Sequence, residues 1–427
     1  MRFMIQLTPP EHSIVYPITS LGDDLAKTLR VWSGINSGSY NDVGLKSMRE
    51  SLADYMADLP GDMTFPALAQ GEVVSPEGQI HTVDYAPAIL LTVRPHAPVQ
   101  VVLTGHYDTV FPADSRFQTP VRVDDDTLNG PGVADMKGGI LVMLNALRAL
   151  EKSGHAGTVG YNVLLSPDEE IGSPGSAPLL AKLGKKSDIG LTYEPALADG
   201  SLAGARKGSG NFALIVRGRA AHAGREHHLG RNAIAALSEF IMGMEALNGQ
   251  RDYVTFNIAK IDGGGASNIV PDLAVGRFNV RMKESEDMAW IDENLARLVA
   301  ELNAKDGITA QLTGGFTRPP KPMAPANRQL LEWVRDAGSA IGQKINWLPS
   351  GGVCEGNNLW ASGCPNVDTL GVCGGNIHSG REFIRLSSLV ERIQLSTLIL
   401  VRIASGAYDA KKLKDMAQQS RNGASAC

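Results

Sequence analysis

The sequence predicts an α/β protein in which a mostly parallel sheet, covered by helices on both faces, is interrupted by an inserted α+β unit. Between residues 88 and 207, short apolar and β-branched runs alternate with helical runs, the pattern of a parallel sheet. Between residues 208 and 316 the order becomes β-α-β-β-α-β, which is typical of a ferredoxin-like unit. The first pattern returns after about residue 319. We therefore expect one discontinuous domain, residues 1–207 and 317–427, with residues 208–316 inserted.

The composition is that of a globular protein, since 43% of the 427 residues are hydrophobic and 20% are charged. The 40 Lys and Arg residues nearly balance the 45 Asp and Glu residues, so we expect no broad basic surface for nucleic acid. No run reaches the roughly 18 apolar residues of a membrane-spanning helix. The first residues, MRFMIQLTPPEH, lack the apolar segment of a signal peptide. We therefore expect a cytoplasmic protein that contacts neither nucleic acid nor membranes.

The apolar periodicity predicts the elements of the first half of the chain. The first fifty residues are expected to be helical, with a Gly- and Ser-rich break at residues 33–40. Short β-branched runs bounded by Pro or Gly predict strands at residues 88–93, 99–104, 161–166 and 189–193. Apolar helical runs predict helices at residues 137–150 and around residues 179–183.

The inserted unit has its own strands and helices. Half-buried patterns predict strands at residues 210–218, 253–261, 274–282 and 309–313. Helical spacing predicts a helix at residues 231–247, with apolar side chains three or four apart, and another at residues 288–302.

Carboxylates and histidines recur just after the predicted strands and turns, in the order His106, Asp108, Asp135, Asp168, Glu169, Glu170, Glu194 and His378. Ligands gather at the carboxyl ends of parallel strands, so we expect these side chains to converge. Converging buried carboxylates need a compensating charge, which a metal ion supplies. The donors are nitrogen and oxygen without a thiolate, a set that suits zinc and also cobalt or manganese.

Each of these residues also has an ordinary structural interpretation. A lone His is commonly a surface residue, an Asp before a helix is commonly an N-cap, and adjacent Glu residues commonly face solvent. The recurrence of two His and several carboxylates at one end of one sheet favours the metal site. The four cysteines form no CxxC pair, so we expect reduced buried or loop thiols and no thiolate zinc site.

The spacing within two pairs of residues, His106 with Asp108 and Glu169 with Glu170, suggests how the members of each pair divide their roles. Residues two apart in a strand point to the same side, so Asp108 can hold the non-ligating nitrogen of His106. Adjacent Glu169 and Glu170 diverge at a strand end, so that one can bind metal while the other faces the substrate.

Seven strings resemble the motifs of one enzyme family: GHYDTVF, GPGVADMKGG, SPDEEIGSPGS, TYEP, AAHAG, ASNIVPD and GGNIHSGREFI. They follow one another in family order with family-like spacing. The chain is therefore identified as a member of the M20 metallopeptidases, with a carboxypeptidase G2-like layout. The resemblance implies a zinc-exopeptidase-like sheet, and it implies that the inserted unit is a lid and dimerisation domain of a homodimer.

The resemblance also implies two Zn²⁺ ions, with Co²⁺ or Mn²⁺ as substitutes. By motif, His106 and Glu194 would bind one ion, and Glu170 and His378 would bind the other. Asp135 would bridge the two ions, and a cis peptide bond is expected after it.

The same resemblance implies the catalytic groups. Glu169 would act as general base, taking a proton from the attacking water and giving it to the leaving amine. His222 in AAHAG would reach into the partner's active site and stabilise the oxyanion there. His227 and His228 are interpreted as surface residues.

Four residues are candidates for binding the substrate's carboxylate. Asn268 and Arg281 match positions that do so in carboxypeptidase G2-like members, and the guanidinium fork suits a carboxylate. Lys207 and Arg318 are candidates for the same role, with an exposed charge as the alternative interpretation of each.

The chain departs from the family pattern in a pocket loop. Where such members have Gly-Gly-Gly-Thr-Asp, this chain has Gly-Gly-Val-Cys-Glu at residues 351–355. We expect a hydrolase of the amide bond of small N-acyl amino acids or dipeptide-like molecules with a free carboxylate. The alternatives are a narrow biosynthetic deacylase, such as an acetylornithine deacetylase-like enzyme, and a non-catalytic binding protein that retains the metal site.

Overall fold

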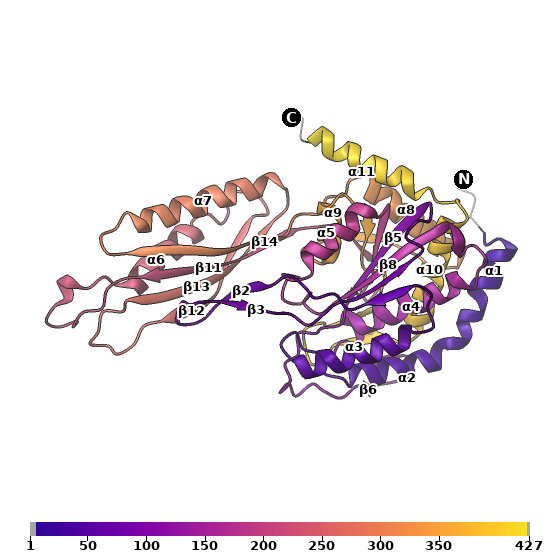
Figure 1. Cartoon of the computed structure of the whole chain (residues 1–427), viewed down its shortest axis with the longest axis horizontal. Coiled ribbons are helices and arrows are strands. Elements are labelled where there is room, and N and C mark those ends of the chain that lie inside the picture. Colours follow the sequence, from indigo (N-terminus) through magenta and orange to yellow (C-terminus); the bar gives the residue numbers. More distant parts are fainter. Residues whose placement is uncertain (1–5, 425–427) are drawn as a thin grey trace.

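The computed structural model describes residues 6–424, which form an elongated molecule with two lobes (Figure 1). The small lobe consists of residues 208–318, and the large lobe consists of residues 6–207 and 319–424. Within residues 6–424, no helix has the length and apolar character needed to cross a membrane.

The N-terminal segment is helical, with the predicted break. The helices are α1 Pro9–Val15, η1 Tyr16–Leu21, α2 Gly22–Ser33 and α3 Asp42–Met56. A capping box of Thr8 and Glu11 starts α1, and the Asn41 side chain accepts a hydrogen bond from the N–H of Gly44 to start α3. The segment between α2 and α3 contains a Gly-Ser turn that reaches the edge of the candidate site described below.

The central sheet has six strands in the order β1-β4-β8-β5-β9-β16. Their bounds are β1 Asp62–Thr64, β4 Ile89–Val93, β8 Val159–Ser166, β5 Val99–His106, β9 Ile189–Thr192 and β16 Asn366–Val367. β8, β5, β9 and β16 are parallel, whereas β4 is antiparallel to β8. The expected mostly parallel sheet is confirmed, and the carboxyl ends of its four parallel strands lie along one edge.

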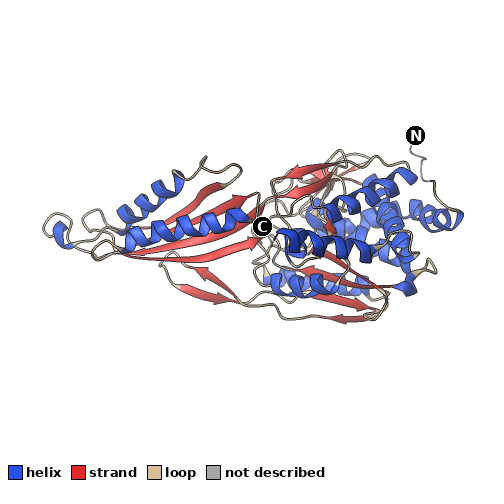
Figure 2. Ribbon diagram, turned by 90° about the horizontal axis from the view of Figure 1, so that it is seen from above, coloured by secondary structure: helices blue, strands red, loops and turns tan. Residues whose placement is uncertain are grey.

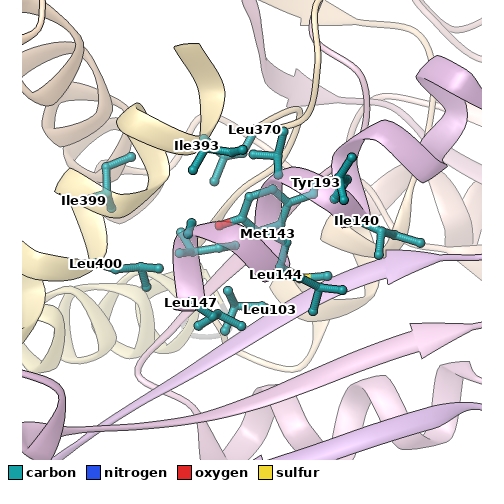
Figure 3. Packing of buried hydrophobic residues seen from close by; sticks show 14 of the residues in the cluster. Leu103, Ile140, Met143, Leu144, Leu147, Tyr193, Leu370, Ile393, Ile399 and Leu400 are labelled. Atoms are coloured by element: carbon teal, nitrogen blue, oxygen red, sulfur yellow. The ribbon is translucent and has the colours of Figure 1, made fainter. Parts of the chain in front are cut away.

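Helices cover both faces of this sheet. On one face α4 Gly138–Glu151 lies between the sheet and α10 Ser387–Ala404, as Figure 3 shows for Leu103, Met143 and Ile399. Because α4 is enclosed, it is apolar on nearly every side. The other face is covered by α5 Ala177–Lys186 and α9 Glu355–Ala361. Two further helices of this lobe, α8 Pro325–Ala340 and α11 Ala410–Ala424, pack against each other.

Two smaller sheets bring distant segments to the edge of the central sheet. One has the order β17-β18-β7-β6, with bounds β17 Gly374–Gly375, β18 Phe383–Arg385, β7 Thr127–Asn129 and β6 Val121–Arg122. It holds the loop with His378 beside the loop with Asp135, and the peptide bond after Asp135 is cis, as the resemblance implied. The other sheet pairs β10 Leu202–Arg206 with β15 Trp347–Ser350.

The small lobe has the ferredoxin-like order that the sequence predicted. Its strands are β11 Gly208–Arg217, β12 Thr255–Gly263, β13 Leu273–Met282 and β14 Thr309–Arg318, antiparallel in the order β12-β13-β11-β14. Helices α6 Ala233–Glu245 and α7 Glu286–Asn303 cover one face and enclose a separate apolar core. Where the chain enters and leaves this lobe, Arg206 and Lys321 exchange backbone hydrogen bonds. The division at 207/208 and 316/317 remains a proposal, and β14 runs two residues beyond it.

A hairpin that the sequence analysis did not identify covers the other face of the small-lobe sheet. Its strands are β2 Gly71–Val74 and β3 Ile80–Val83. Figure 2 shows this hairpin on the side of the sheet opposite the two helices. It extends from the large lobe and contacts Ala213, Ile215 and Val275.

Candidate metal centre

The ends of three parallel strands supply most of the candidate site. β5 ends at His106, β8 is followed by Glu169 and Glu170, and β9 is followed by Glu194. Because these strands are parallel neighbours, their carboxyl ends bring the side chains to one place. Asp135 joins them from the loop after β7.

Five side chains form two groups that share Asp135. In the first group, His106 Nε2 lies 3.1 Å from Asp135 Oδ1 and 3.8 Å from Glu194 Oε2. In the second, His378 Nε2 lies 3.2 Å from Asp135 Oδ2 and 3.3 Å from Glu170 Oε2. Each group keeps its potential ligand atoms within 4.8 Å of one another. The two oxygens of Asp135 thus face two different histidines.

Asp108 contacts His106, a member of the first group, on the side of the ring away from Asp135. Its Oδ1 lies 3.2 Å from the other ring nitrogen of His106, Nδ1. Its carboxylate also accepts hydrogen bonds from the backbone N–H of Glu169 at 3.2 Å and of Glu170 at 3.1 Å. Ser39, in the Gly-Ser turn between α2 and α3, donates to it at 2.7 Å. One fully buried carboxylate therefore connects the histidine, the Glu-Glu pair and the N-terminal segment.

Glu382 supports Asp135 in a similar way. Its fully buried carboxylate accepts hydrogen bonds from the backbone N–H of Gly132 at 3.2 Å, Ala134 at 2.9 Å and Asp135 at 3.0 Å. Three donors converging on one carboxylate fix the backbone from which Asp135 extends. Burial raises the pKa of Glu382 to about 7.

The group is electrostatically suited to positive charge. Burial alone lowers the pKa of His106, but contacts with the carboxylates of Asp108, Asp135 and Glu194 raise it well above its usual value. Hydrogen bonds with Asp135 and Glu170 raise the pKa of His378 to about 10. Burial and the nearby charge of Asp135 raise the pKa of Glu170 well above its usual value. Three carboxylates in one place therefore attract positive charge.

The donor set fits a pair of divalent cations. Two histidine nitrogens and three carboxylates are ligands that zinc, cobalt and manganese accept. Glu194 Oε1 is buried and has no hydrogen-bond partner among residues 6–424, which is costly for a carboxylate oxygen unless a cation contacts it. Bound cations would also supply the positive charge that the carboxylates attract.

Glu169 belongs to neither group and pairs instead with Arg318. The guanidinium of Arg318 lies 2.7 Å from Glu169 Oε1 and also donates to the backbone carbonyl of Glu169 and to Ser173 Oγ, both at 2.9 Å. Burial raises the pKa of Glu169 to about 7, although the charge of Arg318 opposes this shift. Arg318 is 3% exposed, which excludes the interpretation of an exposed charge.

A pocket of about 630 Å³ opens beside the two groups, with Glu169 in its wall. Three arginines line it. Arg318 pairs with Glu169, and Arg206 lies 2.8 Å from Asp368. Arg281 has no carboxylate partner within the described part of the chain, and its Nη1 is buried without a hydrogen bond.

The loop that departs from the family pattern reaches this pocket in part. Gly351 to Cys354 line it, whereas Glu355 lies fully buried at the start of α9, where Ser166 donates to it. Burial raises the pKa of Glu355 to about 8. The thiols of Cys354, Cys364 and Cys373 are free and buried, as expected, and Cys427 lies outside the described residues.

His222 and Asn268 are separated from this pocket in their own chain, and neither is among its lining residues. They lie in neighbouring loops beyond the outer ends of β11 and β12, where the N–H of Ala223 donates to the carbonyl of Asn268. β11 begins at the pocket and spans ten residues, so these loops lie roughly 30 Å away along the strand. His222 is exposed, as are His227 and His228.

The local contacts of His222 set its tautomer. Its Nδ1 accepts hydrogen bonds from the backbone N–H of Gly224 at 3.2 Å and of Arg225 at 3.1 Å. The proton of a neutral ring is then on Nε2, which is left to donate.

Lys207, a candidate for binding the substrate's carboxylate, donates to the carbonyl of Tyr253 at 3.4 Å and does not line the pocket.

The sequence analysis missed three supporting residues. Glu382 lies in a quoted motif, but one Glu after Arg gives no sign that three backbone N–H groups meet it. Ser39 donates to Asp108, 69 residues later in the chain, and Arg206 donates to Gly352, 146 residues later. No local sequence pattern reveals contacts over such separations. The Gly-Ser break before Ser39 was a usable signal, because such turns often lie at sites.

Comparison with known proteins adds a family and a fold. Residues 102–402 match the model of peptidase family M20/M25/M40. Carboxypeptidase G2 from Pseudomonas sp. (strain RS-16) is 28% identical over 313 residues, which cover 72% of this chain and 74% of that protein. Succinyl-diaminopimelate desuccinylase from Bordetella petrii is 30% identical over 336 residues, covering 72% and 85%.

Solved structures agree with the fold. An M20 family metallo-carboxypeptidase from Sulfolobus solfataricus superposes with a TM-score of 0.69 and 18% identity, covering 90% of this chain and 100% of that one. At this sequence identity the match supports the two-lobed fold and nothing further.

Proposed function

The chain belongs to the M20/M25/M40 peptidase family of metal-dependent hydrolases, and on this premise we propose that it is a two-zinc amidohydrolase. Its substrates would be small N-acyl amino acids or dipeptide-like molecules with a free carboxylate. The observation that carries the proposal is Asp135, whose two oxygens each face a different histidine-containing group. A carboxylate so disposed can serve two cations at once.

The proposed ligands follow the two groups. His106 and Glu194 would hold one Zn²⁺, Glu170 and His378 the other, and Asp135 both; Co²⁺ or Mn²⁺ are proposed substitutes. When bound, the ions would polarise the scissile carbonyl and lower the pKa of the attacking water. Asp108 would keep the ring of His106 in its ligating orientation.

Glu169 is the proposed general base. It lines the pocket, belongs to neither ligand group, and is adjacent to a ligand, which supports a role beside the reacting atoms. In this proposal its carboxylate accepts the proton of the attacking water and then donates it to the leaving nitrogen. Arg318 is engaged by Glu169, so its proposed role is to orient that carboxylate.

Arg281 is the proposed binder of the substrate's carboxylate. Its guanidinium lines the pocket with a buried, unpaired Nη1, which a carboxylate can satisfy. Asn268 and His222 are proposed to complete the site from the partner of a homodimer, because in their own chain they lie far along the small lobe. The small lobe would then act as both lid and dimerisation domain. Lys207 adjoins lining residue Arg206, but its side chain donates to Tyr253 and is not part of the lining, so it is assigned only a peripheral part.

A cytoplasmic location is also proposed. Its support is the three described cysteines, which are buried free thiols, the state that a reducing compartment maintains.

The similarity to succinyl-diaminopimelate desuccinylase favours a second candidate, a narrow biosynthetic deacylase such as an acetylornithine deacetylase-like enzyme. Product identity separates the two: release of many different amino acids from varied acyl groups supports the first candidate. Cleavage of a single acyl-amino acid supports the second.

One incubation tests the proposal. Purified protein, with added zinc or with chelator, is mixed with a panel of N-acyl amino acids and dipeptides, and the products are read by mass spectrometry. We expect zinc-dependent release of free amino acids. If protein that holds two metal ions per chain cleaves none of the panel, the proposed activity is wrong.

A further inference from the structure

A second cavity, of about 550 Å³, lies between the β2–β3 hairpin and the open face of the small-lobe sheet. We call it the outer chamber. Hairpin residues Val73, Val74 and Ile80 form one wall, and the sheet supplies the other. Asn211 and Asn279 line both the outer chamber and the pocket beside the metal centre, so the two spaces adjoin at these residues, whose side-chain amides are hydrogen-bonded to each other.

The hairpin wall is fixed to the sheet. Arg217 donates to the carbonyl of Gly78 and Arg277 to the carbonyl of Val74, both at 2.7 Å. The side chain of Val74 packs into a small apolar cluster with Ile215 and two neighbours. Gly78 has a φ of 66°, and a Cβ there would come within 3.0 Å of Ile215. The wall that the hairpin forms is therefore anchored to the sheet.

The lining of the chamber selects for an uncharged occupant. Small side chains, Ala213, Ala259 and Thr313, form its floor. Arg277, the cation in the lining, is already paired with Asp262 and with the hairpin backbone. Glu72 is exposed at the rim. A long aliphatic group fits this surface, whereas an anionic group would find no unpaired cation among the described lining residues.

The position of Arg281 indicates which part of a substrate enters. Its Nε donates to Asn279 Oδ1 at 2.9 Å, so it lies at the junction of the two spaces. It lacks the carboxylate partner that Arg206 and Arg318 have. A substrate carboxylate bound to Arg281 would bring the amino acid that carries it next to the chamber.

We propose that the outer chamber receives the side chain of that amino acid, and that the enzyme prefers leaving amino acids with long, uncharged side chains. This inference rests on the proposed function. The hairpin that forms one wall precedes the segment matched by the family model, residues 102–402, whereas the sheet that forms the other wall lies within it.

The test uses the zinc-loaded full-length enzyme and substrates with a fixed acyl group. The probes are N-acetyl and N-benzoyl derivatives of alanine, norvaline, norleucine and 2-aminooctanoate. We expect kcat/KM to rise at least about tenfold from alanine to norleucine, as added methylenes fill an apolar site. A reciprocal series keeps alanine and lengthens the acyl group from acetyl to octanoyl, and its kcat/KM should rise less.

Two tryptophan variants locate the effect. Ala259 is exposed and lines the chamber, so Ala259→Trp should abolish the rise while the alanine derivatives stay within about twofold of wild type. Ile261, on the same strand, is 53% exposed and outside the lining, so Ile261→Trp should keep the rise.

Three results overturn the inference while leaving the proposed function intact: no rise with side-chain length, a rise only in the acyl series, or equal loss in both variants. If the alanine derivatives themselves are not cleaved, the proposed function fails and the chamber assignment fails with it.

Discussion

We propose that His106 in the large lobe and His222 in the small lobe serve the same reaction, yet their surroundings differ. His106 is fully buried, and the carboxylates of Asp108, Asp135 and Glu194 contact its ring. His222 is exposed, and its ring accepts hydrogen bonds from two backbone N–H groups, of Gly224 and Arg225. A ligand must be fixed by its own subunit, whereas a group that serves a neighbouring subunit must remain accessible.

The largest effect on turnover is expected from a substitution at Glu169, in the large lobe. Replacing Glu169 by Gln should lower kcat about 10³- to 10⁴-fold, because the proton of the attacking water loses its acceptor. Glu169 belongs to neither ligand group, so the metal content, measured by plasma mass spectrometry, should stay at the wild-type value.

The exposed carboxylate Glu245 provides the matched control, and Glu245→Gln should leave kcat unchanged. Near-normal turnover of Glu169→Gln protein would show that another group accepts the proton.

The small-lobe side is tested by His222→Ala. Loss of one oxyanion donor should lower kcat about 10²-fold, with the fold and metal content retained, because the side chain is exposed. His228→Ala, in the same loop, is the control and should behave as wild type.

Mixing distinguishes a shared site from a self-contained one. A heterodimer of His222→Ala and Glu169→Gln subunits has one complete site, so equal mixing should restore about a quarter of wild-type activity. No recovery, with subunit exchange demonstrated by native mass spectrometry, would place His222 outside the partner's site.

The contrast also explains what could be predicted from the sequence. His106, Glu170 and Glu194 follow strands of a parallel sheet, so topology alone predicts that they converge. The role proposed for His222 would need a second copy of the chain, and it came from resemblance. Glu382 escaped notice because its partners are backbone N–H groups about 250 residues away, which leave no mark on side-chain patterns.

A smaller effect, on zinc affinity, is expected at Glu382, which supports the proposed ligand Asp135. Glu382→Ala should weaken zinc binding about 10- to 100-fold, since the backbone that carries Asp135 loses three hydrogen bonds to one carboxylate. Competition with a fluorescent chelator measures this affinity directly. Arg381→Ala, at the exposed neighbouring position, is the control. Wild-type affinity in Glu382→Ala protein would mean that Asp135 is held by other contacts.

The smallest effect concerns the contact of the hairpin with the small lobe. Arg217→Ala removes the hydrogen bond to Gly78, which should cost about 1 kcal/mol of local stability. Amide exchange in residues 71–83 should then accelerate about fivefold. Arg219→Ala, two residues further on and exposed, is the comparison. Unchanged exchange would show that apolar packing alone retains the hairpin.

The hairpin shows where local patterns give too little information. Its strands have four residues each and are largely exposed, so neither length nor alternation separates them from a loop. The Ser-Pro-Glu-Gly run between them was an available turn signal. What the sequence could not indicate is the surface on which the hairpin packs, since that surface begins 130 residues later.

The insertion of the small lobe between Arg206 and Lys321 also sets an order of events during translation. The small lobe is one continuous stretch with its own core, so it can fold while the ribosome is still at work. The large lobe cannot be completed until β16, α10 and His378 have been synthesised, after the small lobe. Synthesis of the roughly 110 inserted residues takes about 5 to 20 s. During that interval the part of α4 that packs on α10 remains uncovered. The nascent chain is then most open to chaperones, and the second histidine of the centre is not yet made.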